Sequence, residues 1–126
     1  AQGAMDETVK YVKERKQFGR TIGQFQNTQF QLADLDTKIE AARLLVRAAA
    51  FKKDQKLPFS VDAARAKLFA AETAMEVTTK AVQFHGGYGY TREYPVERMM
   101  RDAKITEIYE GTSEVQMMVI SGALLK

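Results

Sequence analysis

The sequence predicts an all-α protein, an up-and-down four-helix bundle with an additional short helix. Along several long segments the apolar residues recur at alternating steps of three and four, which places them on one face of a helix. The chain holds only two prolines, and it shows little of the alternation of polar and apolar residues that strands produce. Long helices joined by short loops, each with one apolar face, pack as a bundle. At 126 residues the chain suits one domain with a single core.

The first helix is expected to end near Gly19. Its apolar stripe consists of Met5, Val9 and Val12. The basic residues before Gly19 favour a helix end there, since cations stabilise the carbonyl pole and glycine readily adopts the left-handed conformation. A connector over residues 20–24 follows.

Two long helices are expected next. The first covers residues 26–53, and its stripe consists of Leu32, Leu35, Ile39, Ala42, Val46 and Ala49. It ends before Pro58, because the residue that precedes a proline disfavours helix. The next helix is expected to begin with Ser60 as its N-cap and Asp62 in its first turn. Its stripe consists of Val61, Ala64, Leu68, Ala71, Met75, Thr78 and Val82.

Two shorter helices complete the predicted fold. A glycine-rich loop over residues 85–90 ends the preceding helix. Pro95 can open a helix over residues 95–104, since proline is well tolerated at the first helical position. The last helix is expected over residues 113–124.

The composition excludes several classes of site. The 19 basic and 16 acidic residues give a net charge of only +3 despite an isoelectric point near 9.2, and such mixed signs argue against a nucleic-acid-binding face. Without cysteine there is no disulfide, thiolate zinc site or cysteine nucleophile, and a single histidine argues against a metal centre. No apolar run is long enough to span a bilayer and no signal peptide is visible, so we expect a cytoplasmic protein without membrane contact.

Glu110 raises the central question about function. It stands next to Gly111 and just before a helix start, where Thr112 and Ser113 are both competent caps and Ser113 with Gln116 has the capping-box spacing. In one interpretation Glu110 is a surface carboxylate near the positive end of a helix. In the other it is a general base at a rigid junction, with a pKa that burial can tune. The first expects an exposed carboxylate, and the second expects a largely apolar cavity.

Two further segments combine helix-ending residues with groups that suit a ligand. Around Arg15 and Phe18 the pattern is typical of a helix end, but the guanidinium can also pair with a phosphate and the ring can pack on an aromatic ligand. His85 continues the apolar stripe of its helix, which favours a packed, hydrogen-bonded histidine. Gly86 and Gly87 are typical of a helix end and also allow a backbone to approach a phosphate closely. No strand precedes them, so this run is not a dinucleotide-binding fingerprint.

Other polar and sulfur-bearing residues are expected to serve as surface and core. Arg98, Arg101 and Lys104 are spaced three apart and are predicted to form a solvated basic face. Four methionines are predicted to fill the core or to form a contact surface: Met99, Met100, Met117 and Met118. No serine–histidine–acid set and no nucleotide P-loop is present.

Taken together, these motifs resemble the C-terminal all-helical domain of acyl-CoA dehydrogenases. The resemblance extends over essentially the whole chain, in order, through ERKQFG (14–19), FQ (25–26), QFHGGYG (83–89), EYPVER (93–98), RDAKI (101–105) and IYEGTSE (108–114). Each motif is weak by itself, but the ordered set is specific. The chain looks most like the butyryl-CoA dehydrogenases of anaerobic bacteria.

The resemblance implies a flavin-dependent α,β-dehydrogenation of short-chain acyl-CoA thioesters to trans-2-enoyl-CoA. Glu110 would abstract the α-proton while FAD takes the β-hydride, and the backbone N–H of Glu110, with a flavin hydroxyl, would polarise the thioester carbonyl. Gly111 would contact the substrate. The implied FAD-binding residues are Arg15, Phe18, Gln26, Gln83, Phe84, His85, Gly86, Gly87, Thr112, Ser113 and Glu114. Several of them, Arg15 at the pyrophosphate included, would act across a dimer contact.

The resemblance also implies electron-transfer flavoprotein as the electron acceptor and a homo-oligomer, either dimer or tetramer. Because Ala1 begins within a helical pattern, we expect residues 1–126 to be one helical domain of a longer chain, without the family's N-terminal helical and middle β domains. On that expectation the domain alone neither holds FAD firmly nor turns over. The alternatives are a stand-alone helical interaction or oligomerisation bundle without catalysis and a basic nucleic-acid-binding bundle, which has only the isoelectric point in its favour.

Overall fold

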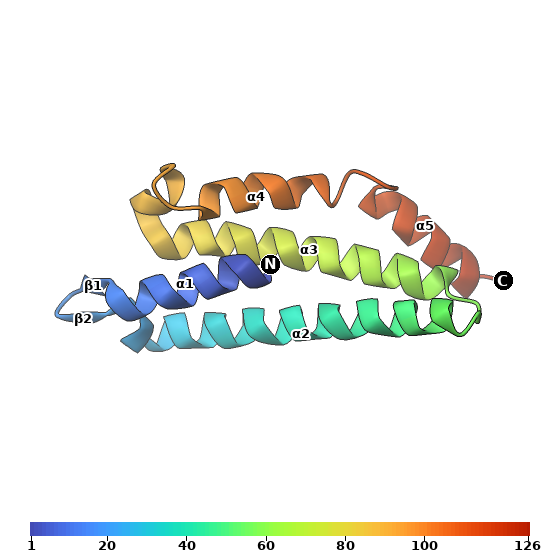
Figure 1. Cartoon of the computed structure of the whole chain (residues 1–126), viewed down its shortest axis with the longest axis horizontal. Coiled ribbons are helices and arrows are strands. Elements are labelled where there is room, and N and C mark those ends of the chain that lie inside the picture. Colours follow the sequence, from blue (N-terminus) through green and yellow to red (C-terminus); the bar gives the residue numbers. More distant parts are fainter.

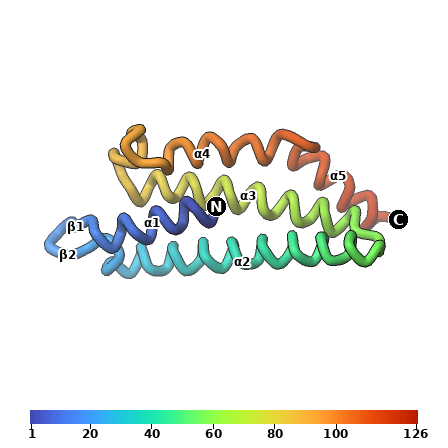
Figure 2. Tube along the Cα trace, in the orientation of Figure 1, coloured from blue at the N-terminus to red at the C-terminus, as the bar shows by residue number.

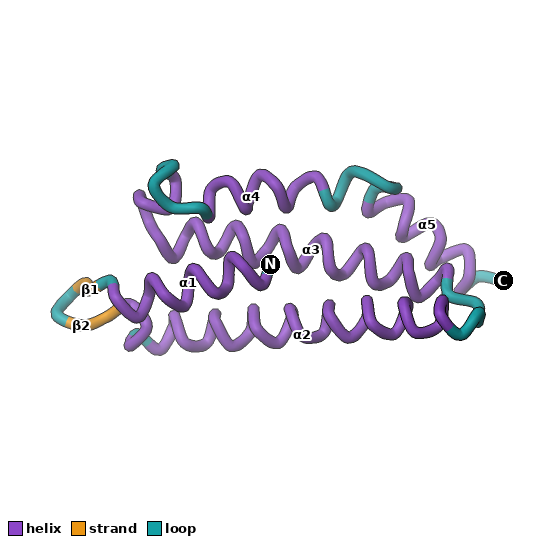
Figure 3. Tube along the Cα trace, in the orientation of Figure 1, coloured by secondary structure: helices purple, strands orange, loops and turns teal.

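The computed structural model describes all 126 residues and consists almost entirely of helices (Figures 1 and 3). The α-helices are α1 (Gln2–Glu14), α2 (Gln26–Asp54), α3 (Ser60–His85), α4 (Val96–Ile105) and α5 (Ser113–Leu124). A hairpin of β1 (Lys16–Gln17) and β2 (Arg20–Thr21) and two 3₁₀ turns, η1 (Ile22–Gln24) and η2 (Gly86–Tyr90), connect them. The predicted all-α class with an additional short helix is confirmed.

Helix α3 is the central element of the bundle. It packs against all four other α-helices, whereas α1, α4 and α5 each cover only part of its length. Successive helices α1 to α4 run in alternating directions (Figure 2). Helix α5 continues in the direction of α4 and runs toward the N-terminal end of α3. This arrangement is an up-and-down bundle in which α4 and α5 together occupy the place of one long helix.

The core lies where α1, α2, α3 and α4 meet. Its buried side chains are Ala4, Met5, Leu35, Ile39, Val77, Ala81 and Val96. Part of the predicted stripe of α2 is buried, but Val46 remains 48% exposed, because α1 begins beside this stretch and covers only the earlier half of α2. The stripe predicted for α3 missed Val77 and Ala81, since a helix packed on several sides buries more than one face.

The end of the first helix differs from the prediction. Helix α1 ends at Glu14, and Arg15 is already extended. Residues 16–21 then form an antiparallel hairpin whose turn residues Phe18 and Gly19 have φ of 52° and 78°. Two positive φ values define the turn that matches the twist of a tight hairpin. Gly19 is therefore left-handed as predicted, but in a hairpin turn rather than at a helix end. Strands of two residues leave no alternation that a sequence pattern could reveal.

Two helix starts also differ from the prediction. Ser60 is the first residue of α3 rather than its N-cap, and the cap position, Phe59, makes no side-chain hydrogen bond. Asp62 in the first turn pairs with Lys52 at the end of α2, with 2.7 Å between Nζ and Oδ2. Pro95 is the N-cap of α4 and not its first residue, a shift of one position.

The remaining surface follows the predicted pattern in part. Arg98, Arg101 and Lys104 are exposed, and Arg98 pairs with Asp102 on the same helix at 3.0 Å. Met99 packs against the core, whereas Met117 and Met118 on α5 are exposed. No helix combines the length and the apolar character that a membrane span requires.

Candidate functional site

The residues predicted to form a site lie in two separate groups. One group surrounds the end of α3 and the hairpin, and the other is the turn between α4 and α5. Helix α4, which has 10 residues and is therefore about 15 Å long, runs from the first region to the second. Within each group the residues lie close together, but the two groups line different cavities.

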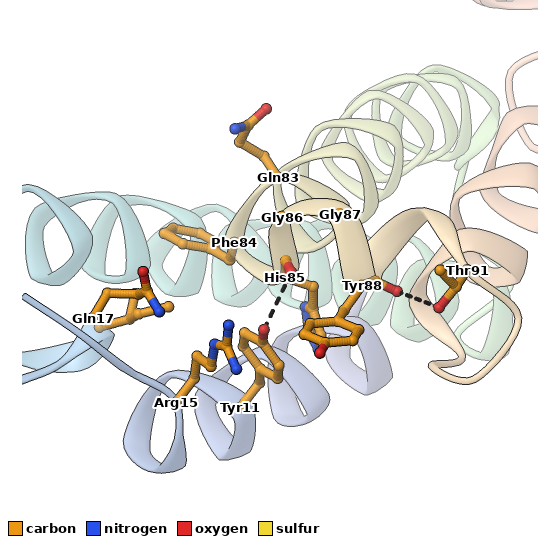
Figure 4. Close-up of a pocket in the computed structure, with 11 residues that line it drawn as sticks. Tyr11, Arg15, Gln17, Gln83, Phe84, His85, Gly86, Gly87, Tyr88 and Thr91 are labelled. Atoms are coloured by element: carbon orange, nitrogen blue, oxygen red, sulfur yellow. Dashed lines mark hydrogen bonds between the residues drawn. The ribbon is translucent and has the colours of Figure 1, made fainter.

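The first group lines a cavity of about 500 Å³ (Figure 4). Six predicted residues contribute to its wall: Arg15, Gln83, Phe84, His85, Gly86 and Gly87. Arg15 comes from the end of α1, and the other five come from the last turn of α3 and the loop after it. The wall also contains residues that were not predicted as site residues: Tyr11, Gln17, Ile22, Tyr88 and Thr91.

His85 is packed and hydrogen-bonded, as the sequence pattern favours. Its side chain is 2% exposed, and its ring stacks on Tyr11 with the ring centres 4.1 Å apart. Nδ1 donates a hydrogen bond of 2.8 Å to the carbonyl of Ala81, because a carbonyl can only accept, and Nε2 is buried without a partner. Burial lowers the pKa of His85, so its neutral form is favoured. The hydroxyl of Tyr11 donates to the backbone carbonyl of His85 at 3.2 Å and anchors the start of the glycine-rich loop.

An open backbone and an unpaired cation meet in this cavity. A Cβ added at Gly86 or at Gly87 would have no heavy atom within 4 Å, so the backbone there is free to be approached. Arg15 forms no ion pair in the chain, and its guanidinium lies 5.3 Å from the ring centre of Tyr88. A guanidinium beside accessible backbone is a combination that suits a phosphate.

Phe18 and Gln26 lie outside the cavity of their own chain. Phe18 is at the tip of the hairpin and is 92% exposed, with only an edge contact to Phe25 whose ring centre is 6.4 Å away. Gln26 is exposed at the first position of α2. A large aromatic side chain with almost no contact inside its own chain is available to a ligand or to a second chain.

The second group is a strained turn that carries Glu110. The backbone of Glu110 has φ of 54°, and Gly111 has φ of 91°. A residue with a Cβ loses about 1–2 kcal/mol in this left-handed region, which glycine tolerates. The N–H of Ser113 donates to the carbonyl of Glu107 at 3.0 Å and closes the turn at its base. Strain of this kind in a non-glycine residue concentrates at functional sites.

The side chain of Glu110 is exposed in this chain. The environment is therefore the one that the surface interpretation expects, and the chain by itself does not supply the apolar cavity that the base interpretation requires. The backbone N–H groups of Glu110, Gly111 and Thr112 make no hydrogen bond within the chain. Three consecutive free donors thus accompany the carboxylate.

The start of α5 differs from the predicted capping box. Thr112 is the N-cap, and its side-chain oxygen accepts from the N–H of Val115 at 3.4 Å. The hydroxyl oxygen of Ser113 is buried and has no partner, and the amide of Gln116 donates to the carbonyl of Gly111 at 3.0 Å instead. The predicted pair of Ser113 and Gln116 is therefore wrong, because the helix begins one residue earlier than that pairing requires.

Glu114 is the remaining predicted residue in this group. It is exposed, and hydrogen bonds from the backbone and from Thr112, with weaker attraction from Lys104 and Lys67, lower its pKa. Glu114 therefore stays ionised. It lines a groove of about 300 Å³ between α3, α4 and α5.

Lys67 is a residue of this region that the sequence patterns missed. Its ammonium donates to the carbonyl of Gly111 across a distance of 2.7 Å and so joins α3 to the turn. One signal was present, since Lys67 is three residues after Ala64 and four before Ala71, on the buried side of the helix. A lysine at that position requires a partner.

The whole chain is similar in sequence to known acyl-CoA dehydrogenases. It is 64% identical over 126 residues to a short-chain-specific acyl-CoA dehydrogenase of Clostridium acetobutylicum, covering 100% of this chain and 33% of that protein. It is 58% identical over 126 residues to CarC, a subunit of the caffeyl-CoA reductase–Etf complex of Acetobacterium woodii, again covering 100% of this chain and 33% of that protein. The chain thus spans about a third of the length of these relatives.

Solved structures share the same fold. The butyryl-CoA dehydrogenase of Megasphaera elsdenii superimposes with a TM-score of 0.98 at 58% identity, over 99% of this chain and 33% of that one. An FAD complex of PigA superimposes with a TM-score of 0.92 at 31% identity, over 96% of this chain and 32% of that one. The family model of the acyl-CoA dehydrogenase C-terminal domain matches residues 1–125. Sequence and fold agree across the whole length, and the chain belongs to the acyl-CoA dehydrogenase family, as a C-terminal domain of that family.

Proposed function

We propose that this chain is the C-terminal domain of a short-chain acyl-CoA dehydrogenase, which converts an acyl-CoA thioester to its trans-2-enoyl thioester. In this proposal residues 1–126 are one helical domain of a longer chain that also contains an N-terminal helical domain and a middle β-domain. The observation that carries the proposal is the strained backbone of Glu110, at φ of 54° beside three free N–H groups. A solvated surface carboxylate has no need of either feature.

Glu110 is the general base in this mechanism. Its carboxylate takes the α-proton of the thioester, and its backbone N–H, which is free in this structure, donates to the thioester carbonyl and stabilises the developing negative charge. FAD supplies the two-electron acceptor for the hydride that leaves the β-carbon. The carboxylate of Glu110 is exposed in this chain, and in this proposal the other domains cover the turn and exclude water from the base. Gly111 lies against the substrate.

The cavity at the end of α3 fits the pyrophosphate of FAD. Arg15 provides the unpaired cation, and Gly86 and Gly87 provide an approachable backbone, which together suit a diphosphate. Gln83, Phe84 and His85 complete this wall. The rigid stack of His85 on Tyr11 holds the loop in place.

A second subunit completes the flavin site in this proposal. Phe18 is 92% exposed at the hairpin tip, and Gln26 is exposed at the first position of α2 and does not line the cavity, so both are available to a flavin held by another chain. The residues of the other group that would hold the flavin serving Glu110 are Thr112, Ser113 and Glu114. The separation of the two groups favours a homo-oligomer, either dimer or tetramer, in which each flavin is shared.

Electron-transfer flavoprotein is the proposed electron acceptor. The support comes from the relative CarC, which is 58% identical and is a subunit of a complex with Etf. The acyl-CoA thioester is the proposed substrate, in agreement with the short-chain specificity of the relative that is 64% identical.

A stand-alone interaction bundle is the second candidate. Helix α5 has no buried residue, and Met118 is 70% exposed, which favours association with another surface. This candidate accounts for the exposed apolar side chains but not for the strain at Glu110. We therefore prefer the dehydrogenase.

Replacing the proposed base tests the function. In the full-length flavoprotein that carries this domain, Glu110→Gln is expected to keep flavin and acyl-CoA binding. It is expected to slow flavin reduction by butyryl-CoA roughly 10²–10⁴-fold, the usual contribution of a general base. Anaerobic bleaching of the flavin absorbance measures this rate.

Glu107→Gln is the matched control, because its carboxylate belongs to the same turn but pairs with Lys104 at 2.6 Å. It should reduce flavin at nearly the parental rate. Flavin reduction by Glu110→Gln at a rate close to that of the control would remove Glu110 from its proposed role.

A further inference from the structure

One backbone carbonyl in the strained turn accepts two side-chain donors. The ammonium of Lys67 donates to the carbonyl of Gly111 across 2.7 Å, and the amide of Gln116 donates to the same oxygen across 3.0 Å. Lys67 belongs to α3, and Gln116 belongs to the first part of α5. Gly111 directly follows Glu110 in the chain, so a constraint on its carbonyl also restricts the backbone that carries the Glu110 side chain.

We propose that Lys67 and Gln116 are positioning residues for Glu110, holding the base-bearing turn in its strained conformation. This inference rests on the proposed function of Glu110 as the base. Neither residue contacts the reacting atoms in this proposal. Each acts through the carbonyl of Gly111.

The turn needs such support because its own backbone provides little. The N–H groups of Glu110, Gly111 and Thr112 have no partner in the chain, and the strained φ of 54° at Glu110 favours relaxation toward an ordinary conformation. The bond from the N–H of Ser113 to the carbonyl of Glu107 closes only the base of the turn. The apex is held by the two side-chain donors.

Lys67 is suited to this role by its surroundings. Its side chain is half-buried on α3, the central helix against which all the others pack. No carboxylate lies within ion-pair distance of its ammonium, so the carbonyl of Gly111 is its direct partner. A hydrogen bond from a charged donor is shorter and stronger than a neutral one. The turn is therefore attached to the best-packed element of the fold.

Gln116 contributes a second, neutral attachment. Its amide nitrogen lies 3.0 Å from the carbonyl oxygen of Gly111 and 3.5 Å from that of Glu110. A Cβ at Gly111 would lie 2.8 Å from this nitrogen and would displace the flexible end of Gln116, and the φ of 91° by itself favours glycine at this position. Two helices thus hold one carbonyl from two sides.

The test compares three lysine variants of the full-length flavoprotein. Lys67→Met removes the ammonium and keeps an unbranched apolar stem, whereas Lys67→Arg keeps a cationic donor. Lys80→Met is the matched control, because Lys80 is on the same helix and donates to Gln31 on α2 across 3.1 Å, far from the turn. For each variant the flavin content, the KM for butyryl-CoA and the rate of flavin reduction are measured.

Lys67→Met is expected to keep flavin content and KM within about twofold and to lose roughly 10–100-fold in flavin reduction, since a misplaced base costs rate more than binding. Lys67→Arg should recover most of the rate, and Lys80→Met should remain parental. Gln116→Leu, which removes a neutral donor, should lose less than Lys67→Met. A parental rate in Lys67→Met, or a loss that follows flavin content or appears equally in Lys80→Met, would overturn the proposal.

Amide hydrogen exchange without substrate separates this proposal from the proposed function. The N–H of Ser113 should exchange faster in Lys67→Met than in the parent, and at the parental rate in Lys80→Met. A parent enzyme that reduces no flavin with any acyl-CoA would refute the dehydrogenase function. Unchanged exchange at Ser113 in Lys67→Met would refute the positioning role even in an active enzyme.

Discussion

A left-handed backbone occurs at three residues other than glycine, namely Phe18, Lys56 and Glu110. Lys56 follows the end of α2, where a left-handed residue is common. Phe18 and Glu110 are both proposed site residues, in turns where asparagine or glycine would cost less free energy. At the scale of the residue, the strain at Phe18 and Glu110 supports the proposal that their side chains are required there.

The buried histidine predicts a dependence of stability on pH. Burial lowers the pKa of His85 below its ordinary value of 6.5, so the unfolded chain binds a proton at a higher pH than the folded chain does. Between the lowered pKa and pH 6.5 the unfolded state holds more protons, and the free energy of unfolding must fall as the pH falls. Above pH 6.5 both states are neutral at this residue, and its contribution is constant.

Urea denaturation at several pH values between 5.5 and 7.5 measures this effect. His85→Phe keeps an aromatic ring against Tyr11 but cannot titrate, so it should show a smaller loss of stability on acidification. Equal slopes in the parent and in His85→Phe would contradict the expected role of burial.

At the scale of the element, the glycines of the turn η2 serve two different purposes, close packing and an accessible backbone. Gly89 is pressed against the end of α3, where an added Cβ would lie 2.5 Å from the carbonyl oxygen of Val82 and 2.8 Å from the Cβ of His85. Gly87 faces open space in the cavity. One glycine allows close packing, and the other leaves the backbone accessible.

Two alanine substitutions distinguish the packing role of Gly89 from the binding role of Gly87. Gly89→Ala should lower the free energy of unfolding by about 1–3 kcal/mol, because backbone atoms must move to admit the methyl group. Gly87→Ala should change it by less than about 0.5 kcal/mol, as at an open site, yet weaken flavin binding in the full-length protein. Thermal or urea unfolding and flavin titration measure the two effects. Equal destabilisation by both substitutions would contradict this division.

At the scale of the whole molecule, one end of the bundle lacks a partner. No residue of α5 is buried, and its exposed apolar side chains include Met117, Met118 and Leu124. The two site groups are separated by the length of α4, and Glu110 lacks an apolar cavity. These features support the proposal that the domain acts together with further domains and a second subunit.

The 126-residue chain in isolation is therefore expected to be helical but catalytically silent. Circular dichroism should report the helices, whereas gel filtration after mixing with FAD should recover protein with little flavin. Butyryl-CoA should not be oxidised in the presence of an artificial electron acceptor. Self-association through the exposed apolar side chains is also expected. Stoichiometric flavin together with turnover would contradict this prediction.

The helices were predictable because their patterns are local. Residues 26–53 and 113–124 were expected from apolar spacing and caps, and α2 and α5 begin and end within one residue of those bounds. The hairpin over residues 16–21 was not predictable, since strands of two residues carry no pattern. Ser60 was wrongly assigned as a cap, and of the two candidate caps Thr112 and Ser113 only Thr112 serves, because adjacent polar residues satisfy the same local rule.

The sequence by itself determined the helical fold, the family and the residues proposed to act, since periodicity and ordered motifs are properties of the chain order. Only the tertiary structure revealed the stack of His85 on Tyr11, the strain at Glu110 and the bond from Lys67 to Gly111. The two residues of that bond are 44 positions apart, and their contact exists only because α3 packs beside the turn. Local patterns specify elements, whereas contacts between distant residues depend on how those elements pack.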